Sequence, residues 1–151
     1  MKKILAVASG GGHWKELLLL KNSFDISGSS IVKYVTTLDG LPQEECFHNF
    51  EIINESNITN KLSLIVSCYQ ILKIYIKFRP DIVITTGAAP GIITVLFGKI
   101  FNSKTIWVDS IANADKLSLS GYLAKNVADI VLTQWEHLAD GDKVLYKGSI
   151  F

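Results

Sequence analysis

Short apolar stretches alternate with longer helix-like segments along the whole chain, and several of the stretches are apolar without interruption. Uninterrupted apolar runs are typical of parallel strands that are buried on both faces of a sheet. The expected strands are 3–8, 31–36, 50–53, 81–85, 105–108 and 129–133, and the expected helices are 13–23, 60–78, 90–101 and 118–126. This alternation predicts a single α/β domain over residues 1–151, with a doubly wound, parallel, Rossmann-like sheet.

In a sheet of this kind, ligands bind beyond the carboxyl ends of the strands. Four loops that follow expected strands should therefore share one edge of the sheet: 9–13, 86–91, 109–118 and 134–142. A fifth segment, 38–49, is expected to be a mobile loop.

The loop after the first strand is rich in glycine and leads directly into a helix. Such a turn exposes unpaired backbone N–H groups at the positive end of a helix dipole, which favours phosphate or another anion. A tight turn that binds nothing is the alternative. The candidate binding residues here are Ser9, Gly10, Gly11 and Gly12, followed by His13.

The same loop lacks the marks of two common nucleotide sites. The dinucleotide fingerprint requires a third glycine where this chain has Lys15, and the phosphate loop of NTPases requires Gly-Lys-Ser/Thr where His13 follows Gly12. A histidine at a helix start can donate to an oxyanion or accept a proton, or it can simply bond to backbone. His13 is accordingly a candidate catalytic residue.

A second loop of small residues follows the strand at 81–85 and also enters a helix. Its candidate phosphate-binding residues are Thr86, Gly87, Ala88 and Gly91. Two such loops at one sheet edge could hold a diphosphate between two helix N-termini.

Polar residues follow the next two strands. Asp109 leaves a buried strand at the expected ligand edge and could bind hydroxyls or act as a base, although an aspartate that caps a turn is equally compatible with the sequence. Further candidate acceptor-binding residues in these loops are Ser110, Asn113 and Glu136.

The helix expected at 62–78 has too much apolar surface for one sheet face to cover. Its polar residues form one narrow stripe, which leaves an apolar arc of roughly 240°. Either neighbouring helices bury this arc, or it meets a bilayer or a partner subunit. The candidate membrane or partner residues are Tyr69, Lys73, Lys77 and Arg79. The apolar helix at 91–101 could extend that surface or be the most buried helix of the fold.

Composition narrows the function classes. The chain is 48% hydrophobic and 19% charged with a net charge of +1, so it has surplus apolar surface and no basic field for nucleic acid. The N-terminal apolar run is too short for a signal peptide, so we expect a cytoplasmic chain. The cysteines and histidines lack ligand spacing, so neither a metal centre nor a disulfide framework is expected.

Several motifs occur together in a recognisable order. They are Ser9-Gly-Gly-Gly-His13, Arg79-Pro80-Asp81, Thr85-Thr86-Gly87-Ala88, Asp109-Ser110, Leu117-Ser118-Leu119-Ser120-Gly121 and Thr133-Gln134-Trp135-Glu136. As a set they resemble the membrane-recruiting subunit of the two-part UDP-N-acetylglucosamine transferase of asparagine-linked glycosylation. They also resemble its bacterial capsule and exopolysaccharide counterparts, the PssD-type proteins. The family is similar to the N-terminal half of a MurG-like GT-B glycosyltransferase.

The resemblance implies an acceptor-side subunit of a heterodimeric glycosyltransferase. Such a subunit would bind a polyprenyl-diphosphate-linked sugar at the cytoplasmic face of the plasma membrane, as a peripheral protein that is inactive alone. A separate partner would bind the UDP-sugar, and no cofactor would be needed. Where the family has a glutamate this chain has Asp109, and Asn113 and Lys116 stand nearest to the position of a family arginine. A non-catalytic membrane anchor and a free-standing nucleotide-binding domain are the alternatives.

Overall fold

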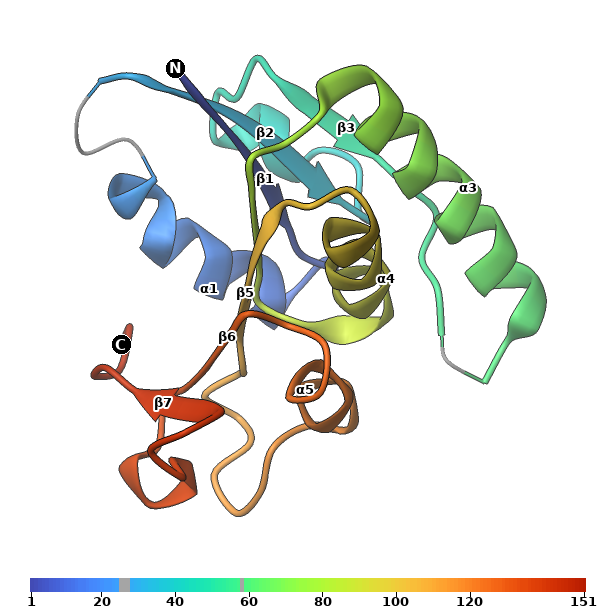
Figure 1. Ribbon diagram of the computed structural model, residues 1–151. Coiled ribbons are helices and arrows are strands. Elements are labelled where there is room, and N and C mark those ends of the chain that lie inside the picture. Colours follow the sequence, from blue (N-terminus) through green and yellow to red (C-terminus); the bar gives the residue numbers. More distant parts are fainter. Residues whose placement is uncertain (25–27, 58) are drawn as a thin grey trace.

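The computed structural model describes residues 1–24, 28–57 and 59–151, and within these ranges it contains one seven-stranded parallel sheet (Figure 1). The strand order is β3–β2–β1–β4–β5–β6–β7, so the direction of winding reverses between β1 and β4. The strands are β1 (Lys2–Val7), β2 (Ser30–Thr36), β3 (Phe50–Ile52), β4 (Ile82–Thr85), β5 (Lys104–Val108), β6 (Ile130–Thr133) and β7 (Val144–Tyr146).

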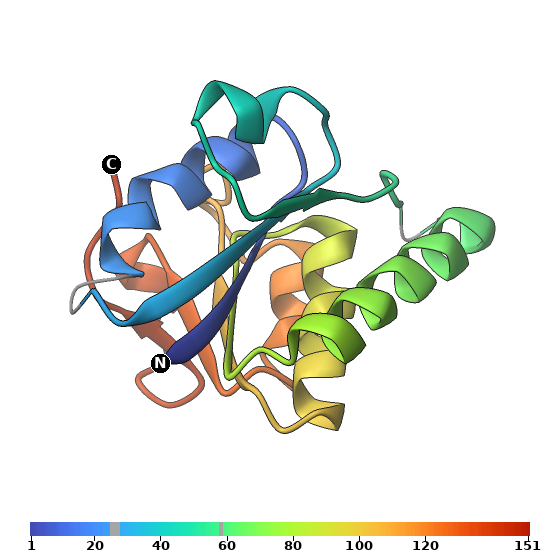
Figure 2. The same cartoon turned by 90° about the horizontal axis from the view of Figure 1, so that it is seen from above.

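Helices cover both faces of the sheet, as doubly wound folds require (Figures 1 and 2). On one face, α1 packs together with the segment between β2 and β3; α3, α4 and α5 lie on the other. The α-helices are α1 (Gly12–Leu20), α2 (Leu41–Glu44), α3 (Lys61–Phe78), α4 (Ala88–Ile100) and α5 (Leu119–Ala124), and short 3₁₀ turns occur at η1 (Lys21–Ser23) and η2 (Glu136–Leu138).

The predicted fold class, the six predicted strands and the four predicted helices are confirmed, with small shifts at their ends. Besides the 3₁₀ turn η2 in the predicted loop 134–142, one strand and one α-helix were not predicted. The strand β7 adds a seventh, three-residue strand at the sheet edge, and α2 forms inside the segment 38–49, where Pro42 occupies its first turn.

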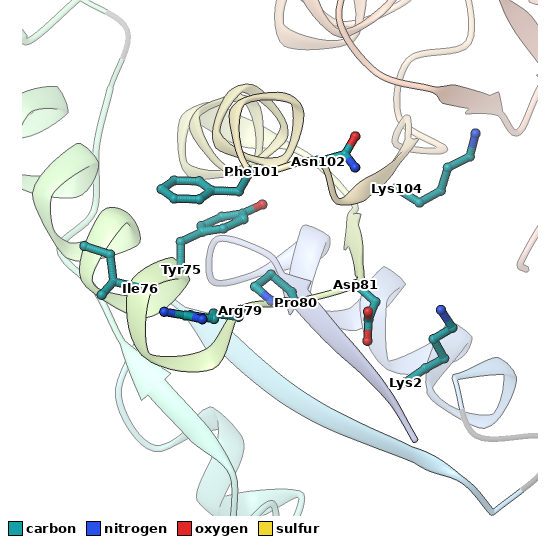
Figure 3. A pocket seen from close by; sticks show the side chains of 9 residues that line it. All are labelled: Lys2, Tyr75, Ile76, Arg79, Pro80, Asp81, Phe101, Asn102 and Lys104. Atoms are coloured by element: carbon teal, nitrogen blue, oxygen red, sulfur yellow. The ribbon is translucent and has the colours of Figure 1, made fainter.

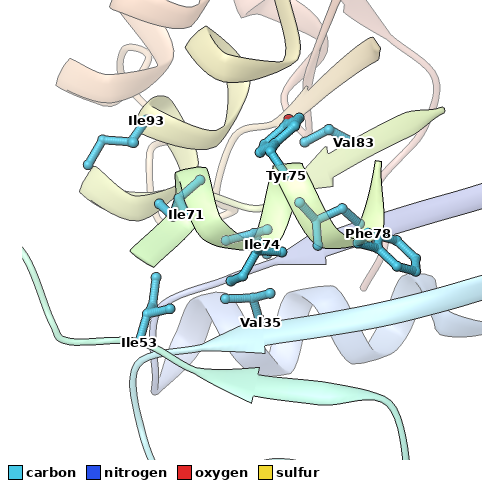
Figure 4. Close-up of a cluster of buried hydrophobic side chains, with 10 residues drawn as sticks. Val35, Ile53, Ile71, Ile74, Tyr75, Phe78, Val83 and Ile93 are labelled. Carbon is cyan, nitrogen blue, oxygen red and sulfur yellow. The ribbon is translucent and has the colours of Figure 1, made fainter. Parts of the chain in front are cut away.

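Alternating residues of each central strand feed two hydrophobic layers. Leu5 and Val7 of β1 join the layer under α3 and α4, whereas Ile4 and Ala6 face the aromatic layer under α1. Figure 4 shows the first layer, which contains Val35, Ile53, Ile71, Ile74, Tyr75, Phe78, Val83 and Ile93. Fully burying an aliphatic side chain contributes about 1.5–3 kcal/mol, so this layer fixes how α3 and α4 lie on the sheet.

The polar stripe of α3 does not face solvent along its whole length. Ser67 is buried and donates to the backbone oxygen of Asn54 at 3.1 Å, and the amide of Gln70 bonds to the side chain of Asn54. The stripe therefore fixes the segment before α3 against the helix. In Figure 2 the first turns of α3 point away from the sheet, and the outward face is apolar: Leu62, Ile65, Val66, Tyr69 and Ile76 are exposed.

The junction between β5 and β6 depends on one carboxylate. Asp129 accepts hydrogen bonds from the backbone N–H and hydroxyl of Thr105, at 2.7 and 2.9 Å, and pairs with Lys99 at 2.7 Å. Burial opposes ionisation of Asp129, but Lys99 and the two bonds from Thr105 outweigh burial and lower its pKa to about 2.

We expect Asp129→Asn to destabilise the protein at pH 7 by about 1–2 kcal/mol. Because the folded-state pKa of Asp129 is depressed, its contribution is complete above the unfolded pKa and disappears as pH falls through about 2. Urea unfolding of the wild type and of Asp129→Asn, at pH 7 and at pH 2, measures how far the difference in their free energies of unfolding shrinks at low pH. Asp115→Asn, which removes an exposed carboxylate, is the control, and an equal loss in both variants contradicts the prediction.

Candidate active site

The four loops predicted to share an edge do meet beyond the carboxyl ends of the strands. The loop after β1 contacts the loop after β4, since His13 and Thr86 bond to each other. Ser110, in the loop after β5, donates to Glu16 of α1 at 2.8 Å. Gln134, directly after β6, donates to the backbone oxygen of Asp109 at 3.1 Å. The loops after β1 and β4 flank the reversal of winding, where doubly wound sheets bind ligands.

His13 is held by two hydrogen bonds to Thr86. Its Nδ1 lies 2.9 Å from the Thr86 backbone oxygen, and the Thr86 hydroxyl donates to the His13 backbone oxygen at 2.6 Å. Because a carbonyl oxygen only accepts, Nδ1 carries the hydrogen, and Nε2 of the neutral ring is left as a proton acceptor. The His13 side chain is 30% exposed, so it remains within reach of a ligand.

The second loop fits closely around this imidazole. Gly87 has φ 137° and ψ −165°, a region open almost only to glycine, and a Cβ placed on it would lie 2.7 Å from Cε1 of His13. Ala88 follows with φ 64°, a left-handed conformation that costs alanine about 1–2 kcal/mol. Strain of this kind is often retained at functional sites.

The first loop brings the N-terminus of α1 to the same place. Gly11 is the residue before the helix and has φ 78°. The N–H of Gly10 donates to the hydroxyl oxygen of Thr37, so it is already engaged within the chain. The amides of Gly12 and His13 begin the helix, where they have no partner within the helix itself. Ser9 is buried. The loop therefore presents a helix N-terminus beside the imidazole of His13.

Asp109 is 2% exposed, and both of its carboxylate oxygens bond within the chain. Oδ1 accepts from Trp107 Nε1 at 3.1 Å and from the Ser118 hydroxyl at 2.6 Å, and Oδ2 accepts from the Ser118 N–H at 2.9 Å. Ser118 in turn caps α5. This geometry makes Asp109 an anchor for the loop 110–118, which is the turn-capping role that the sequence left open beside contact with an acceptor hydroxyl.

A small cavity of about 230 Å³ opens between these loops. Its lining comes from three of the four loops and from the start of α5: His13, Ala88, Ser110, Ala112, Asn113, Ser118, Leu119 and Ser120. The structure thus brings together His13, Ala88, Ser110 and Asn113 of the predicted site.

Two predicted ligand contacts lie elsewhere. Gly91 is buried inside α4, where an added Cβ would collide with the Thr85 hydroxyl and approach Trp107, so it serves helix-to-sheet packing. Glu136 is exposed at the start of η2 and does not line the cavity.

Glu16 was not considered a candidate site residue from the sequence. It is 2% exposed, and its Oε1 accepts from the Ser110 hydroxyl at 2.8 Å and from the Ile111 N–H at 2.9 Å. Burial works to raise its pKa, but His13 and these two bonds outweigh burial and lower it. The available signal was the spacing to His13, because residues three apart share a helix face.

A larger cavity of about 670 Å³ lies at the opposite edge of the sheet, beside the amino ends of β4 and β5 (Figure 3). The rings of Tyr75 and Phe101 stack at 5.3 Å on one side of it, and Lys2, Arg79 and Lys104 supply positive charge. The predicted membrane or partner residues Lys73 and Lys77 are also exposed at this end of α3, so the cations collect away from the His13 cavity.

Two absences hold for the residues that the structure describes. No group of three or more His, Cys, Asp or Glu side chains could hold a metal ion within residues 1–24, 28–57 and 59–151. Over the same ranges, no helix is both long and apolar enough to cross a membrane.

A family model described as "Oligosaccharide biosynthesis protein Alg14 like" matches residues 49–150, about two thirds of the chain and three of the four loops at the site. The chain belongs to the Alg14 family. This confirms the family expected from the sequence motifs, whereas the likeness to PssD-type proteins stays a prediction.

Several curated relatives of this chain carry the name "UDP-N-acetylglucosamine transferase subunit ALG14". The mouse protein is 24% identical over 98% of this chain and 82% of its own length. The Yarrowia lipolytica protein is 21% identical over 91% of this chain and 76% of its own length. The Cryptococcus neoformans protein is 34% identical over 45% of this chain, a match that spans only 32% of its own length.

Solved structures show the same fold at low sequence identity. Acinetobacter baumannii MurG superposes with a TM-score of 0.78 at 12% identity, over 97% of this chain and 45% of MurG. The MnaA–UDP structure from S. aureus superposes with a TM-score of 0.75 at 12% identity, over 99% of this chain and 46% of the MnaA chain. This chain therefore has a Rossmann-like fold, and the matched region spans a little under half of each of these two proteins.

Proposed function

We propose that this chain is the acceptor-side subunit of a two-part glycosyltransferase. The complete enzyme would transfer a sugar from a UDP-sugar to a polyprenyl-diphosphate-linked saccharide, with UDP-N-acetylglucosamine as the donor suggested by the relatives' name. The observation that carries the proposal is the placement of His13 between two loops that each lead into a helix N-terminus. The capsule or exopolysaccharide setting stays a prediction.

The acceptor diphosphate would lie against the N-termini of α1 and α4. Backbone N–H groups and the helix dipole favour anions there without any further cation. Ser110 and Asn113, which line the cavity, would bond to the acceptor sugar. The acceptor hydroxyl would then lie near Nε2 of His13, the ring nitrogen not used by Thr86.

The reaction needs a base for the acceptor hydroxyl and stabilisation for the departing UDP. His13 would take the proton as the hydroxyl oxygen attacks the anomeric carbon and the bond to UDP breaks. The partner subunit would bind the UDP, in keeping with the word "subunit" in the name that the relatives carry. Co-purification with the partner from the native host, followed by transfer assays of the complex and of this chain alone, tests the proposal. Full activity of the chain alone overturns it.

We further propose that the subunit binds the cytoplasmic face of the plasma membrane as a peripheral protein. The outward face of α3 is apolar, with Ile65 and Tyr69 exposed to 67% and 63%. Lys73, Lys77 and Arg79 toward the end of α3 would meet anionic headgroups, where each cation near the surface contributes about 1 kcal/mol. The exposed side chains Leu96, Ile100 and Phe101 of α4 and its C-terminus extend the surface.

The double variant Ile65→Glu/Tyr69→Glu should bind anionic vesicles at least about tenfold more weakly than the wild type, because two exposed apolar side chains that would insert into the bilayer are replaced by charged ones. Co-sedimentation with phosphatidylglycerol vesicles measures the change. Leu19→Glu places a charge on an exposed apolar position of α1, on the other face of the sheet, and should bind as the wild type does. Equal losses in both variants would contradict the assignment of the membrane face to α3.

A non-catalytic anchor for a complete transferase is the second candidate, which the exposed apolar face of α3 also favours. In that case the α3 variant would abolish activity at the membrane, while His13→Ala would leave transfer intact. If the chain is instead an enzyme subunit, as we propose, both the α3 variant and His13→Ala should lose transfer activity.

A further inference from the structure

Glu16 is a buried carboxylate that the proposed reaction does not yet use. Its Oε1 accepts hydrogen bonds from Ser110 and Ile111, while its Oε2 is enclosed and has no hydrogen-bond partner among the residues that the structure describes. The imidazole of His13 lies beside it, with Nδ1 3.6 Å from Oε2. That separation is longer than a hydrogen bond but short enough for an ion pair. A buried charge is expensive unless it is paired, so Glu16 stabilises the imidazolium of His13 whenever the ring takes up a proton.

Glu16 is itself rigidly placed. Two segments far along the chain from α1 contact its Oε1: the loop after β5 through Ser110 and Ile111, and Gln134 after β6, whose amide nitrogen lies 3.5 Å away. Because these contacts fix the carboxylate, its field on His13 does not depend on a flexible side chain.

We propose that Glu16 is a positioning residue for His13: its buried carboxylate holds the imidazole with Nδ1 toward Thr86 and stabilises the imidazolium that forms when Nε2 accepts a proton. This role rests on the proposed transferase function, whereas the pairing of the two side chains does not. During transfer the acceptor O–H proton moves to Nε2, the oxygen bonds to the anomeric carbon, and UDP leaves with the bonding electrons. The positive charge left on His13 then faces the negative charge of Glu16. An acid that orients and balances a histidine base is a recurrent solution in unrelated enzymes.

Two carboxylates act on the imidazole. Glu16 on its own helix raises the pKa of His13 most strongly, burial lowers it in part, and Asp109 at the end of β5 adds a smaller upward contribution. The net direction is upward from the ordinary value. Neutralising Glu16 should therefore lower the pKa of His13 and weaken its imidazolium, while Asp109 keeps the smaller effect.

The test titrates the His13 ring by NMR in the isolated chain, in the wild type, in Glu16→Gln and in Glu16→Asp. We expect the wild-type pKa to lie above that of the urea-unfolded chain, to fall in Glu16→Gln, and to be partly restored in Glu16→Asp, which keeps a carboxylate. An unchanged pKa in a folded Glu16→Gln overturns the pairing. Should that variant not fold, a wild-type value at or below the unfolded one overturns it equally.

Transfer assays of the complete two-part enzyme test the role in the reaction. Glu16→Gln should lower kcat by about 10–100-fold with little change in KM, and should move the acid limb of the pH–rate profile to lower pH. A lower kcat with an unshifted limb would indicate a merely structural role and overturn the proposal. Absence of transfer by the wild-type complex would instead overturn the proposed function, and the NMR titration would still decide whether the pair exists.

Discussion

Replacing His13 by alanine should slow transfer by the complete two-part enzyme by about 10²–10⁴-fold. The loss follows from geometry: Thr86 engages Nδ1 at 2.9 Å, so Nε2 is the ring atom left to take the proton of an acceptor hydroxyl. Steady-state transfer to a synthetic polyprenyl-diphosphate acceptor, measured from pH 5 to pH 9, gives the loss. It should also show that the acid limb caused by His13 disappears in the variant.

Two variants separate the loss of a base from other effects. His13→Asn keeps a side-chain donor for the Thr86 oxygen but supplies no base, so it should be about as slow as His13→Ala. His48→Ala removes an exposed histidine after α2 and should transfer at the wild-type rate. A fast His13→Asn enzyme would show that the residue positions the loop and takes no proton.

The sequence predicted the strands well because burial on both faces leaves a strong signal. The runs at 81–85, 105–108 and 129–133 each have an uninterrupted apolar centre, and each matches the observed strand to within one residue at either end. The strand β7 left no such signal. It is three residues long, lies at the sheet edge, and only Val144 is buried. A short edge strand with one buried residue cannot be told from a loop by its pattern.

The polar stripe of α3 shows a different limit of periodicity. A helical wheel places Ser67 and Gln70 on the polar side, which is correct, but it does not reveal what they face. Both bond to Asn54, in the irregular segment that precedes the helix. The partner of a polar side chain depends on how a loop folds, and loop conformation carries little periodic signal.

At the candidate site, the sequence correctly predicted which loops meet, but it did not predict the orientation of every side chain in them. Parallel topology alone brings the ends of β1, β4, β5 and β6 to one edge. Whether a given side chain points into the cavity depends on contacts that the topology does not fix. Asp109 turns inward to Trp107 and Ser118, so the polarity that marked it as a candidate serves the loop instead.

The glycine Gly87 should be among the residues of this site least tolerant of substitution. Gly87→Ala would put a Cβ 2.7 Å from Cε1 of His13 and force alanine into a backbone region costing about 1–3 kcal/mol. Because the imidazole lies directly against this position, we expect it to move. A displacement of about 1 Å is enough to slow an enzyme about 10²-fold, so the variant should lose transfer at least to that extent.

The control is Gly141→Ala, which also places alanine at a positive φ but causes no collision. Gly141 has φ 75°, and an added Cβ would have no atom within 4 Å, so this variant should lose about 1 kcal/mol of stability and keep its transfer rate. Urea unfolding and transfer assays measure the two effects separately, and the NMR titration reports whether the His13 ring has moved. If the Gly87→Ala and wild-type enzymes transfer at equal rates, the close packing of Gly87 against the His13 ring is not required for transfer, and the prediction is wrong.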